Sequence, residues 1–563
     1  MIVLGLNSFF EHPAAALIRD GEILFAIEDE RLTRVKHGKK YTPYKTYVPF
    51  DAIGAALRHT GIRPEDIDEV AYSYDRWSHL TSLWGCFTGA RLSSLQEELA
   101  AFRSTSNMRA ALKQGYELPH RYRDVLHAGA FRRTRFREWD HHLSHAASAF
   151  FCSGFDESLI VVADGSGEVA CTSIYVGRGR TIKKVATIPL PHSLGFFYSF
   201  ITAHLGFEAF SDEYKVMGLA AYGKPDCVKQ LREIIVRQDG GRYQIRMECL
   251  KNLEPLLGPA RMVGEPLTDR HRDIARSAQV LLEETLEHVI GHHLAHTGMR
   301  RLCTAGGVFL NCVANARLAR LPGVEGYFVQ PAAHDAGTAI GAAALSCLRN
   351  GLPPQLRYSS MFLGSSYDDA QILPALDEAR LPYTRIVPGE APATLARLLA
   401  QEKVVALFRG RMEFGPRALG GRSLLASPLS SSTRDRLNTI KGREEFRPLA
   451  PLVTEEAYDH YFEGPPNRYM MLAVKARQAA KEVAPAVVHA DMTARAQIVR
   501  HAEDPFLHAT LRSFEELTGV PIVANTSFNV RGKPIDESPV DALCSFFTTG
   551  IDAMLIGDYL VER

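Results

Sequence analysis

Residues 159–176 read LIVVADGSGEVACTSIYV, and this stretch decides the fold of the chain. One apolar run ends in Asp-Gly-Ser-Gly-Glu and a second apolar run follows, which predicts a strand, a tight turn and another strand. Residues 2–27 follow the same plan: IVLGL and AAALI precede a turn at Asp20-Gly21, and ILFAI follows it. The two stretches share little sequence, but their common plan predicts an internal duplication.

Helical patterns alternate with these strands. Apolar residues three and four positions apart predict a long helix over residues 273–297. The next stretch, LCTAGGVFLN at 302–311, predicts a strand, a Gly-Gly turn and a helix, and residues 327–345 repeat this pattern. Pro, Gly and Ser are enriched over residues 350–366, so we expect a domain boundary near there.

The composition excludes several classes of protein. Lys and Arg total 65 against 64 for Asp and Glu, so the chain has no overall field for a polyanion and no nucleic-acid partner is implied. No uninterrupted apolar run approaches the ~18 residues that a membrane helix needs, and the N-terminus has no signal-peptide pattern. The 9 cysteines lie singly, without a C-x-x-C pair, which indicates a protein of the reducing cytoplasm.

His141 and His145 lie in the sequence HHLSHAASAFF. On a helix, a spacing of four places both imidazoles on one face, where they can share a metal ion. Asp164, at the end of the strand LIVVA, and Asp335, in the loop AAHDAGT, are candidate further ligands, because carboxylates at strand ends point into the ligand crevice of α/β proteins. Iron, manganese and zinc all suit such ligands. The alternative is a pair of hydrogen-bonded core histidines.

Two glycine turns are candidate phosphate sites. Gly165 and Gly167 in one turn, and Gly306 and Gly307 in the other, would let a phosphate approach the backbone N–H groups closely. Neither turn is a Walker A or a G-x-G-x-x-G motif, so an ordinary tight turn is the alternative for each.

Arginines are concentrated in loops of the C-terminal part. The loops read GPRALGGRS at 415–423, KGREEFRP at 441–448, TARAQ at 493–497 and NTSFNVRGKP at 525–534. Guanidinium groups match pairs of phosphate or carboxylate oxygens, so converging loops would form a pocket for a small dianion and a triphosphate. The alternative is a set of surface arginines paired with acids.

Two N-terminal histidines are candidates for proton transfer. His12 precedes the second predicted strand, and His37 lies in the sequence RVKHG. A histidine with a pKa near neutrality is the usual general base for an alcohol. Each of them, taken singly, is also compatible with an ordinary surface or core position. The basic run at 121–137 is compatible with either a solvated helical face or a rim that steers anions.

Together these stretches resemble the O-carbamoyltransferase family, which includes antibiotic-modifying and nodulation-factor carbamoyltransferases. The matching motifs follow the family's order over nearly the whole chain: GLN, HPAAAL, EDERLTRVKH, HHLSHAASAF, ADGSGE, DEYKVMGLAAYG, AGGVFLN, DAGTAIGAA, GPRALGGRS, KGREEFRPLAP, TARAQ and NTSFNVRGKPI. Two positions depart from the family's pattern. The residues after His12 lack its acidic and hydroxyl members, near the expected acceptor site, and Gly421 replaces its Asn.

The resemblance implies an α/β protein of two domains. Residues 1–355 would be similar to the actin-like and Kae1-like ATP-binding fold and would transfer the carbamoyl group. Residues 356–563 would be similar to the YrdC fold and would form a carbamoyl-adenylate from carbamoyl phosphate and ATP, with Mg²⁺ on the triphosphate. The acceptor would be a hydroxyl group of a small natural product of the antibiotic type.

The resemblance also implies roles for individual residues. His12 would be the catalytic base, with His37 close to the acceptor. A metal, Fe²⁺ or another divalent ion, would be held by His141, His145, Asp164 and Asp335. The carbamoyl-adenylate and its nucleotide would be held by Asp164, Gly165, Gly167, Glu168, Lys215, Gly306, Gly307 and Asn311. Carbamoyl phosphate and ATP would be held in the second domain by Arg417, Lys441, Arg447, Arg495, Asn525, Ser527 and Asn529.

Other functions compete with this reading. A tRNA threonylcarbamoyl-type transferase would use the same two folds but would need a surface for a polyanion. A hydrogenase-maturation carbamoyltransferase would carry an acylphosphatase region and cysteine zinc fingers, and neither pattern is in the sequence. An actin-like ATP-binding regulator would leave the arginine loops unexplained. The acceptor, which we expect to contact residues 75–138, the metal and the oligomeric state, including a homo-oligomer, stay open.

Overall fold

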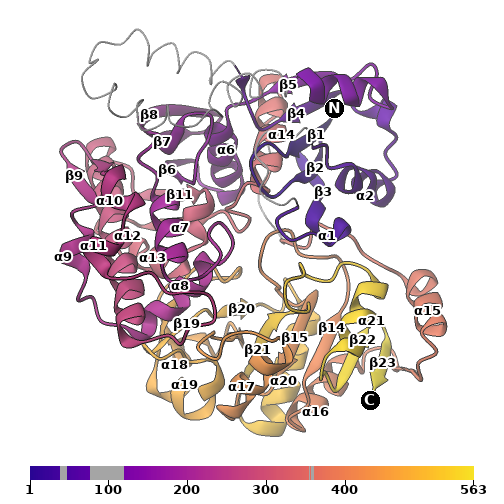
Figure 1. Cartoon of the computed structure of the whole chain (residues 1–563). Helices are drawn as coiled ribbons and strands as arrows, with labels where there is room; N and C mark the ends of the chain where they lie inside the picture. The colour runs from indigo at the N-terminus through magenta and orange to yellow at the C-terminus, as the bar shows by residue number, and fades with distance from the viewer. Residues whose placement is uncertain (39–46, 77–119, 354–355, 357–359) are drawn as a thin grey trace. The chain divides into compact units, whose positions relative to one another are not determined.

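The computed structural model describes residues 1–38, 47–76, 120–353, 356 and 360–563 (Figure 1). The chain forms two compact units, and each is assembled from separate segments. Unit 1 consists of Met1–Ser193, Arg301–Val308 and Ala332–Arg357, and unit 2 of Leu194–Arg300, Phe309–Pro331 and Tyr358–Arg563. The division into homologous domains at residues 355 and 356 stays a prediction. No helix among the described residues is long and apolar enough to cross a bilayer.

Unit 1 contains two sheets built on one plan. In the first sheet, with strand order β3-β2-β1-β4-β5, the first three strands form an antiparallel meander and β4 pairs parallel to β1. In the second, β6, β7 and β8 form the meander and β11 pairs parallel to β6. The strands are β1 (Ile2–Asn7), β2 (Ala14–Arg19), β3 (Glu22–Glu28), β4 (Glu69–Tyr72), β5 (Arg135–Glu138), β6 (Glu157–Ala163), β7 (Ala170–Arg178), β8 (Thr181–Pro189) and β11 (Arg301–Ala305).

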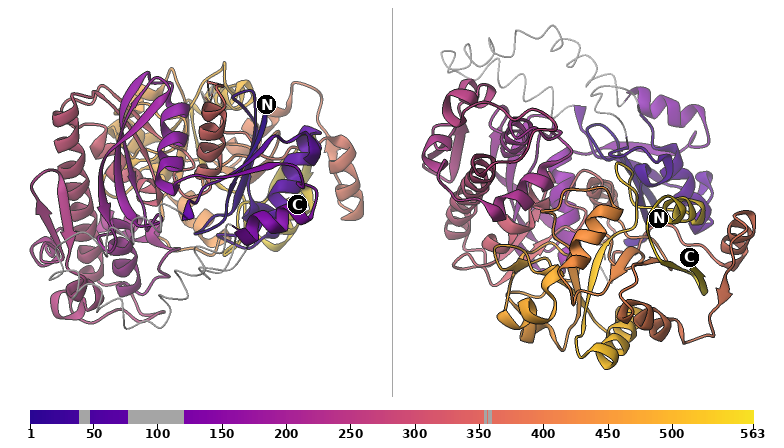
Figure 2. Two further views of the ribbon diagram at one scale, coloured as in Figure 1. Left: turned by 90° about the horizontal axis from the view of Figure 1, so that it is seen from above. Right: turned by 60° about the horizontal axis from the view of Figure 1, so that its bottom comes forward.

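These sheets confirm the predicted α/β class, and their shared topology is the duplication that the sequence indicated. It also agrees with the actin-like arrangement that the family resemblance implies. Figure 2 shows the first sheet, in indigo, from two further directions. The described helices of this unit include α1 (Asp29–Thr33), α2 (Phe50–Thr60), α6 (His141–Ser153) and α14 (Gly337–Arg349), and residues 120–128 are also helical.

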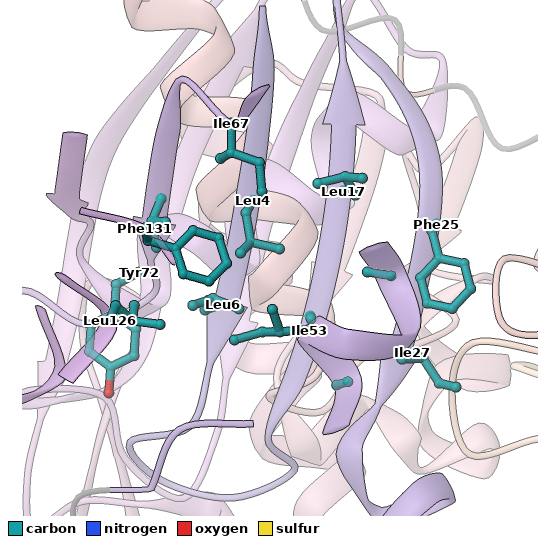
Figure 3. Close-up of a cluster of buried hydrophobic side chains, with 14 of the residues drawn as sticks. Leu4, Leu6, Leu17, Phe25, Ile27, Ile53, Ile67, Tyr72, Leu126 and Phe131 are labelled. Atoms are coloured by element: carbon teal, nitrogen blue, oxygen red, sulfur yellow. The ribbon is translucent and has the colours of Figure 1, made fainter. Parts of the chain in front are cut away.

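Alternation along β1 places different contacts on its two faces. Leu4 and Leu6 lie in a buried apolar cluster with Ile53 of α2, as Figure 3 shows. Gly5 points the other way, toward α14, where a Cβ would lie 1.9 Å from the carbonyl oxygen of Ala339. The backbones of β1 and α14 therefore approach so closely that only glycine fits at position 5.

Unit 2 contains a mixed sheet with strand order β13-β23-β22-β14-β15-β21-β16-β20, beside helices of which α12 is the longest described. The eight strands of this sheet are β13 (Thr384–Arg385), β14 (Val405–Phe408), β15 (Arg422–Ala426), β16 (Ala450–Thr454), β20 (Gln497–Val499), β21 (Ile522–Ser527), β22 (Ala553–Ile556) and β23 (Tyr559–Glu562). Unit 2 also includes β9 (Ile235–Gln238), β10 (Arg242–Ile245), β12 (Gly326–Val329), β17 (Phe462–Glu463), β18 (Val474–Ala476) and β19 (Thr493–Ala494), which lie outside this sheet. Its helices are α7 (Leu194–His204), α8 (Glu213–Leu219), α9 (Val228–Leu231), α10 (Met247–Lys251), α11 (Glu254–Leu257), α12 (Asp269–Thr297), α13 (Cys312–Leu318), α15 (Asp369–Glu378), α16 (Ala391–Ala400), α17 (Ser432–Ile440), α18 (Tyr458–Tyr461), α19 (Gln478–Val483), α20 (Pro505–Thr518) and α21 (Pro539–Thr548).

The contact between α6 and α14 provides a test of this packing. A Cβ at Gly341 would lie 1.8 Å from the carbonyl oxygen of Ser144 in α6. We expect Gly341→Ala to force the two helices apart and to destabilise the fold by about 2–3 kcal/mol or more, as overpacked cores do. Scanning calorimetry of the purified chain would measure this as a lower midpoint of thermal unfolding.

Gly291 is the matched control, because it lies in the interior of α12 and a Cβ there would meet nothing within 4 Å. Gly291→Ala should leave the midpoint unchanged or raise it, since Ala loses less backbone entropy on folding than Gly. Equal midpoints for the two variants would contradict the close contact between α6 and α14.

Candidate active site

Two histidines and two aspartates gather in unit 1. His141 and His145 lie on the first turns of α6, Asp164 follows β6, and Asp335 precedes α14. One nitrogen or oxygen atom from each lies within 4.8 Å of the others. His145 Nε2 is 3.1 Å from Asp164 Oδ2, and His141 Nε2 is 3.5 Å from Asp335 Oδ1. The structure therefore brings together the four residues that the sequence suggested as metal ligands.

Backbone groups orient these side chains. The Nδ1 atom of His141 lies 3.2 Å from the carbonyl oxygen of Ser73, so Nδ1–H donates there and Nε2 faces the aspartates. The backbone N–H of Glu11 donates to Asp335 Oδ2 at 3.0 Å, which leaves Oδ1 for the histidines. Asp164 Oδ1 accepts the N–H of Gly165 at 2.7 Å, which leaves Oδ2 for them.

The donor set and its burial fit a divalent metal ion. His141 and His145 are fully buried, and His141 Nε2 has no hydrogen-bond partner among the described residues. Burial opposes the charged form of His141, but Asp335 and Asp164 outweigh it and raise the pKa of His141 well above its ordinary value. The pocket thus attracts positive charge. Two imidazoles with two carboxylates suit iron, manganese or zinc.

The carboxylate of Glu168 accepts a backbone hydrogen bond at the N-terminus of α6. Its Oε1 accepts the backbone N–H of Asp75 at 2.8 Å and that of His141 at 3.0 Å. Burial raises the pKa of Glu168 to about 8. At the neighbouring position, a Cβ on Gly167 would lie 2.8 Å from the ring of His142. The turn 164–168 is therefore packed tightly against the helix that carries the histidines.

The second glycine turn lies beside Asp164. A Cβ on Gly306, whose φ is +99°, would lie 2.2 Å from the carbonyl oxygen of Ala163. The N–H of Gly307 lies 3.3 Å from Asp164 Oδ1. Parallel pairing of β6 with β11 brings the ends of these strands together. The structure thus places Gly165, Gly306 and Gly307 next to the buried cluster.

His12 lies in a separate group of histidines in unit 1. Its ring centroid is 4.3 Å from that of His334 and 4.9 Å from that of His37. Burial, with His334 and His37 nearby, holds the pKa of His12 well below its ordinary value. His334 Nε2 lies 2.8 Å from Glu28 Oε1, and the N–H of His37 donates to Glu30. His334 precedes Asp335, so this group borders the histidine–aspartate cluster along the chain.

Two residues of the predicted nucleotide set belong to unit 2. Lys215 Nζ lies 2.9 Å from Asp212 Oδ2 and 2.9 Å from Glu444 Oε1. Asn311 accepts the N–H of Ala314 at the start of α13 and donates to Gln279 at 2.8 Å. Both therefore have protein partners within unit 2.

The cationic cluster of unit 2 consists of residues from the predicted arginine loops: Arg417, Lys441, Arg443, Arg447 and Arg495. Burial and Arg495 lower the pKa of Arg417 to about 9, and burial and Arg447 lower that of Arg443 to about 9. The pKa of Lys441 also lies well below its ordinary value because of burial and Arg443. These positively charged groups are buried and repel one another. Such a site favours the binding of an anion.

The cationic cluster has unused donors. Arg417 Nε, Arg443 Nη2 and Arg495 Nε are buried and have no hydrogen-bond partner among the described residues. Ser527 and Asn529 serve the cluster indirectly, because Lys441 Nζ donates to Ser527 Oγ at 3.1 Å and to Asn529 Oδ1 at 2.7 Å. A buried N–H without an acceptor is costly. A bound oxyanion would supply the missing acceptors.

Arg443 was not among the predicted site residues, although it lies in the quoted run KGREEFRP. The signal was its position between Lys441 and Arg447, but a sequence cannot show which of several arginines in a loop is buried. The same loop is attached to α8 and the turn before it. Glu444 pairs with Lys215, and the guanidinium of Arg447 lies 4.6 Å from the ring centroid of Tyr214.

A buried carboxylate shapes the loop that carries Arg417. Glu413 Oε1 accepts the backbone N–H groups of Leu419 and Gly421 at 2.7 Å each and that of Arg422 at 3.2 Å. Asn525 Nδ2 donates to the carbonyl oxygen of Ala418 at 3.0 Å, so this predicted ligand also supports the loop. Glu413 is the positioning residue that the sequence analysis missed.

Two arginines of the basic run 121–137 form ion pairs. Arg137 Nε lies 2.9 Å from Glu69 Oε1, and Arg123 pairs with Asp124. Glu69 is fully buried and Arg137 lies in strand β5, so residues 121–137 do not form the single solvated helical face that was one of the two expectations. Residues 77–119, which make up most of the stretch expected to contact the acceptor, lie outside the described residues.

Comparison with known proteins assigns the family. Residues 2–344 match the family model described as "Carbamoyltransferase N-terminus", and residues 396–563 match "Carbamoyltransferase C-terminus". The chain therefore belongs to the carbamoyltransferase family. This confirms the resemblance seen in the sequence motifs and the prediction of an enzyme that transfers carbamoyl groups.

The relatives span most of the chain. Nodulation protein NolNO of Sinorhizobium fredii is 37% identical over 99% of this chain and 80% of its own length. Nodulation protein NolO of Bradyrhizobium diazoefficiens is 38% identical over 75% of this chain and 79% of its own length. Uncharacterized protein sll1178 of Synechocystis is 34% identical over 100% of this chain and 96% of its own length.

The support that Glu413 gives to its loop can be tested by substitution. Glu413→Ala would leave the N–H groups of Leu419, Gly421 and Arg422 without their acceptor, at about 1–3 kcal/mol for a buried donor. We expect the midpoint of thermal unfolding to fall by about 5 °C or more. Glu413→Gln keeps a carbonyl oxygen and should stay within about 2 °C of the parent. Calorimetry that gave both variants the same large loss would contradict the role of this one oxygen.

Proposed function

We propose that the chain is an ATP-dependent O-carbamoyltransferase. It forms a carbamoyl-adenylate from carbamoyl phosphate and ATP, and then transfers the carbamoyl group to a hydroxyl of a small natural product of the antibiotic type. Family membership supports carbamoyl transfer. The observation that carries the proposal is the cationic cluster of unit 2, with its buried N–H groups that lack acceptors among the described residues.

The cluster suits the substrates of the first step. Carbamoyl phosphate and the triphosphate of ATP, with Mg²⁺ as its counter-ion, carry several negative charges and many acceptor oxygens. Arg417 Nε, Arg443 Nη2 and Arg495 Nε can donate to these oxygens, because none of them makes a hydrogen bond among the described residues. Preorganised donors of this kind stabilise charge that shifts between oxygens during the reaction.

The proposed reaction balances as follows. Water cleaves carbamoyl phosphate to carbamate and phosphate, and a carbamate oxygen attacks the α-phosphorus of ATP while pyrophosphate leaves. The acceptor hydroxyl then attacks the carbonyl carbon of the carbamoyl-adenylate, and AMP leaves with the electron pair of the broken C–O bond. The hydroxyl proton passes to a base. The products are the carbamate ester, AMP, pyrophosphate and phosphate.

His12 is the proposed base of the second step. Its low pKa keeps the imidazole neutral near pH 7, so it can accept a proton. Its Nδ1 is buried and has no hydrogen-bond partner among the described residues. His37 borders it and would lie close to the acceptor. The loss of the acidic and hydroxyl residues after His12 would change contacts with the acceptor more than proton transfer.

The histidine–aspartate cluster would hold the metal ion of the transfer step, Fe²⁺ or another divalent ion. When bound, such an ion acts as a Lewis acid toward a phosphate or carbonyl oxygen. The neighbouring glycine turns, with N–H groups at Gly165 and Gly307 and little side-chain bulk, would hold the adenylate. Through their hydrogen bonds to backbone N–H groups, Glu168 would help to position α6 and Asp335 the loop before α14 beside this site.

The proposed function is tested by one assay of the full chain. Incubation with ATP, Mg²⁺, carbamoyl phosphate and a panel of hydroxylated natural products, followed by mass spectrometry, should show an acceptor that gains one carbamoyl group and an equal amount of AMP. Transfer RNA in a parallel reaction tests the threonylcarbamoyl alternative. Absence of carbamoyl-phosphate-dependent AMP with divalent metal present would refute the adenylate route and favour the ATP-binding regulator.

Two substitutions should separate the half-reactions. Arg417→Gln removes a guanidinium from the cationic cluster and should lower carbamoyl-phosphate-dependent exchange of pyrophosphate into ATP by about 10²-fold. His12→Asn should leave this exchange near its parent rate and lower transfer to the acceptor by ~10²–10⁴-fold. Isotope exchange and product mass spectrometry measure the two rates on the same preparations.

Arg512→Gln is the control for the first substitution, because Arg512 is an exposed arginine that pairs with Glu515. It should change neither rate. If His12→Asn lowers exchange and transfer equally, His12 is not the base of the second step. If Arg417→Gln and Arg512→Gln behave alike, the cationic cluster is not the adenylate-forming site.

A further inference from the structure

The last two turns of α12 carry a group of histidines that the proposed reaction does not use. The sequence there reads HHLAH, and its members are His292, His293 and His296. His292 and His296 lie four residues apart, so they project from the same face of the helix. Short histidine-rich stretches of this kind are a recognised composition for metal binding.

The two outer histidines are held in parallel. Their ring centroids are 5.9 Å apart and their planes differ by 8°. Both side chains are exposed to solvent, so core packing does not explain the arrangement. Two histidines that lie four residues apart on a helix, as in H-x-x-x-H, are spaced to share one metal ion. Small rotations of exposed imidazoles would bring one nitrogen of each onto a common ion.

The hairpin of β9 and β10 supports this part of the helix. A Cβ on Gly241 would lie 2.9 Å from His292 Cβ, so the hairpin turn packs directly against the His292 side chain. One turn earlier, His288 Nε2 lies 2.8 Å from the carbonyl oxygen of Gln238 and 3.1 Å from that of Arg242. His288 is therefore occupied by the hairpin, whereas no hydrogen bond among the described residues occupies the rings of His292 and His296.

His293 is the independent sign of a polar site. It is 5% exposed, and neither of its ring nitrogens has a hydrogen-bond partner among the described residues. Its ring centroid lies 5.0 Å from that of His292. His293 thus adds two buried ring nitrogens without described partners beside the two exposed imidazoles.

We propose that His292 and His296 bind a divalent transition-metal ion at the surface of unit 2, with water in the remaining positions. Neutral imidazole nitrogens prefer Cu²⁺, Ni²⁺ and Zn²⁺ over Mg²⁺ and Ca²⁺. The partial negative charge at the end of α12, which stops at Thr297, also favours a cation there. This site has no carboxylate among its proposed ligands, unlike the buried cluster of His141, His145, Asp164 and Asp335.

Counting bound ions tests the proposal on the full chain. The parent protein and His292→Ala/His296→Ala are dialysed against the same Ni²⁺ solution, and bound nickel is measured by mass spectrometry. The double variant should hold one ion fewer, because any ion in the buried cluster is retained by both proteins. His288→Gln is the matched control. It changes a histidine of the same helix, keeps an N–H donor for the hairpin, and should bind as the parent does.

A second measurement identifies the ligands. Electron paramagnetic resonance with Cu²⁺ should show coupling to imidazole nitrogens in the parent, and one such signal should be missing from the double variant. Calorimetry checks that both variants unfold near the parent's midpoint, as expected for exposed side chains. Equal nickel counts for the parent and the double variant would overturn the proposal, and so would a loss in the His288→Gln control of the same size.

Discussion

The carboxylate of Asp164 is the point on which the arrangement of unit 1 depends. One oxygen accepts the N–H of Gly165 and lies within 3.3 Å of the N–H of Gly307, and the other faces His145. These contacts require the ends of β6 and β11 to lie side by side, as their parallel pairing ensures. A side chain at Gly306 would collide with Ala163 and separate the strand ends. The geometry of the histidine–aspartate cluster therefore follows from backbone packing.

Unit 2 meets a different physical constraint, because it buries positive charge without enough nearby acid to neutralise it. Lys215 is balanced by Asp212 and Glu444, but the described contacts of Arg417 and Arg495 include no carboxylate. Such burial costs stability in the absence of a ligand. The rigid support of the Arg417 loop by Glu413 offsets part of that cost. The buried N–H groups of the cationic cluster that lack described acceptors support the proposal that it binds a polyphosphate.

Local patterns predicted much of this from the sequence, and long-range contacts explain what they missed. The strand–turn–strand plan and the spacing of His141 and His145 are properties of short segments, so periodicity and spacing reveal them. The role of Glu413 could not be predicted, because it accepts hydrogen bonds from backbone N–H groups of the loop that follows it. The conformation of that loop is not evident from the sequence. Arg443 differs from other arginines only in its burial, which depends on segments far away in the chain.

The electrostatic environments of the two proposed half-reactions are opposite, and each is suited to its own chemistry. Adenylate formation concentrates anions, so mutually repelling guanidinium groups favour it, and burial with the neighbouring arginines lowers the pKa of Arg417 and of Arg443. Transfer to a hydroxyl needs a neutral base, and the burial of His12 among other histidines keeps it uncharged. A base placed within the cationic cluster would also be neutral, but its protonated form would be opposed by every neighbouring charge. Around His12, Asp164 favours the protonated imidazole, against burial and the nearby His334 and His37.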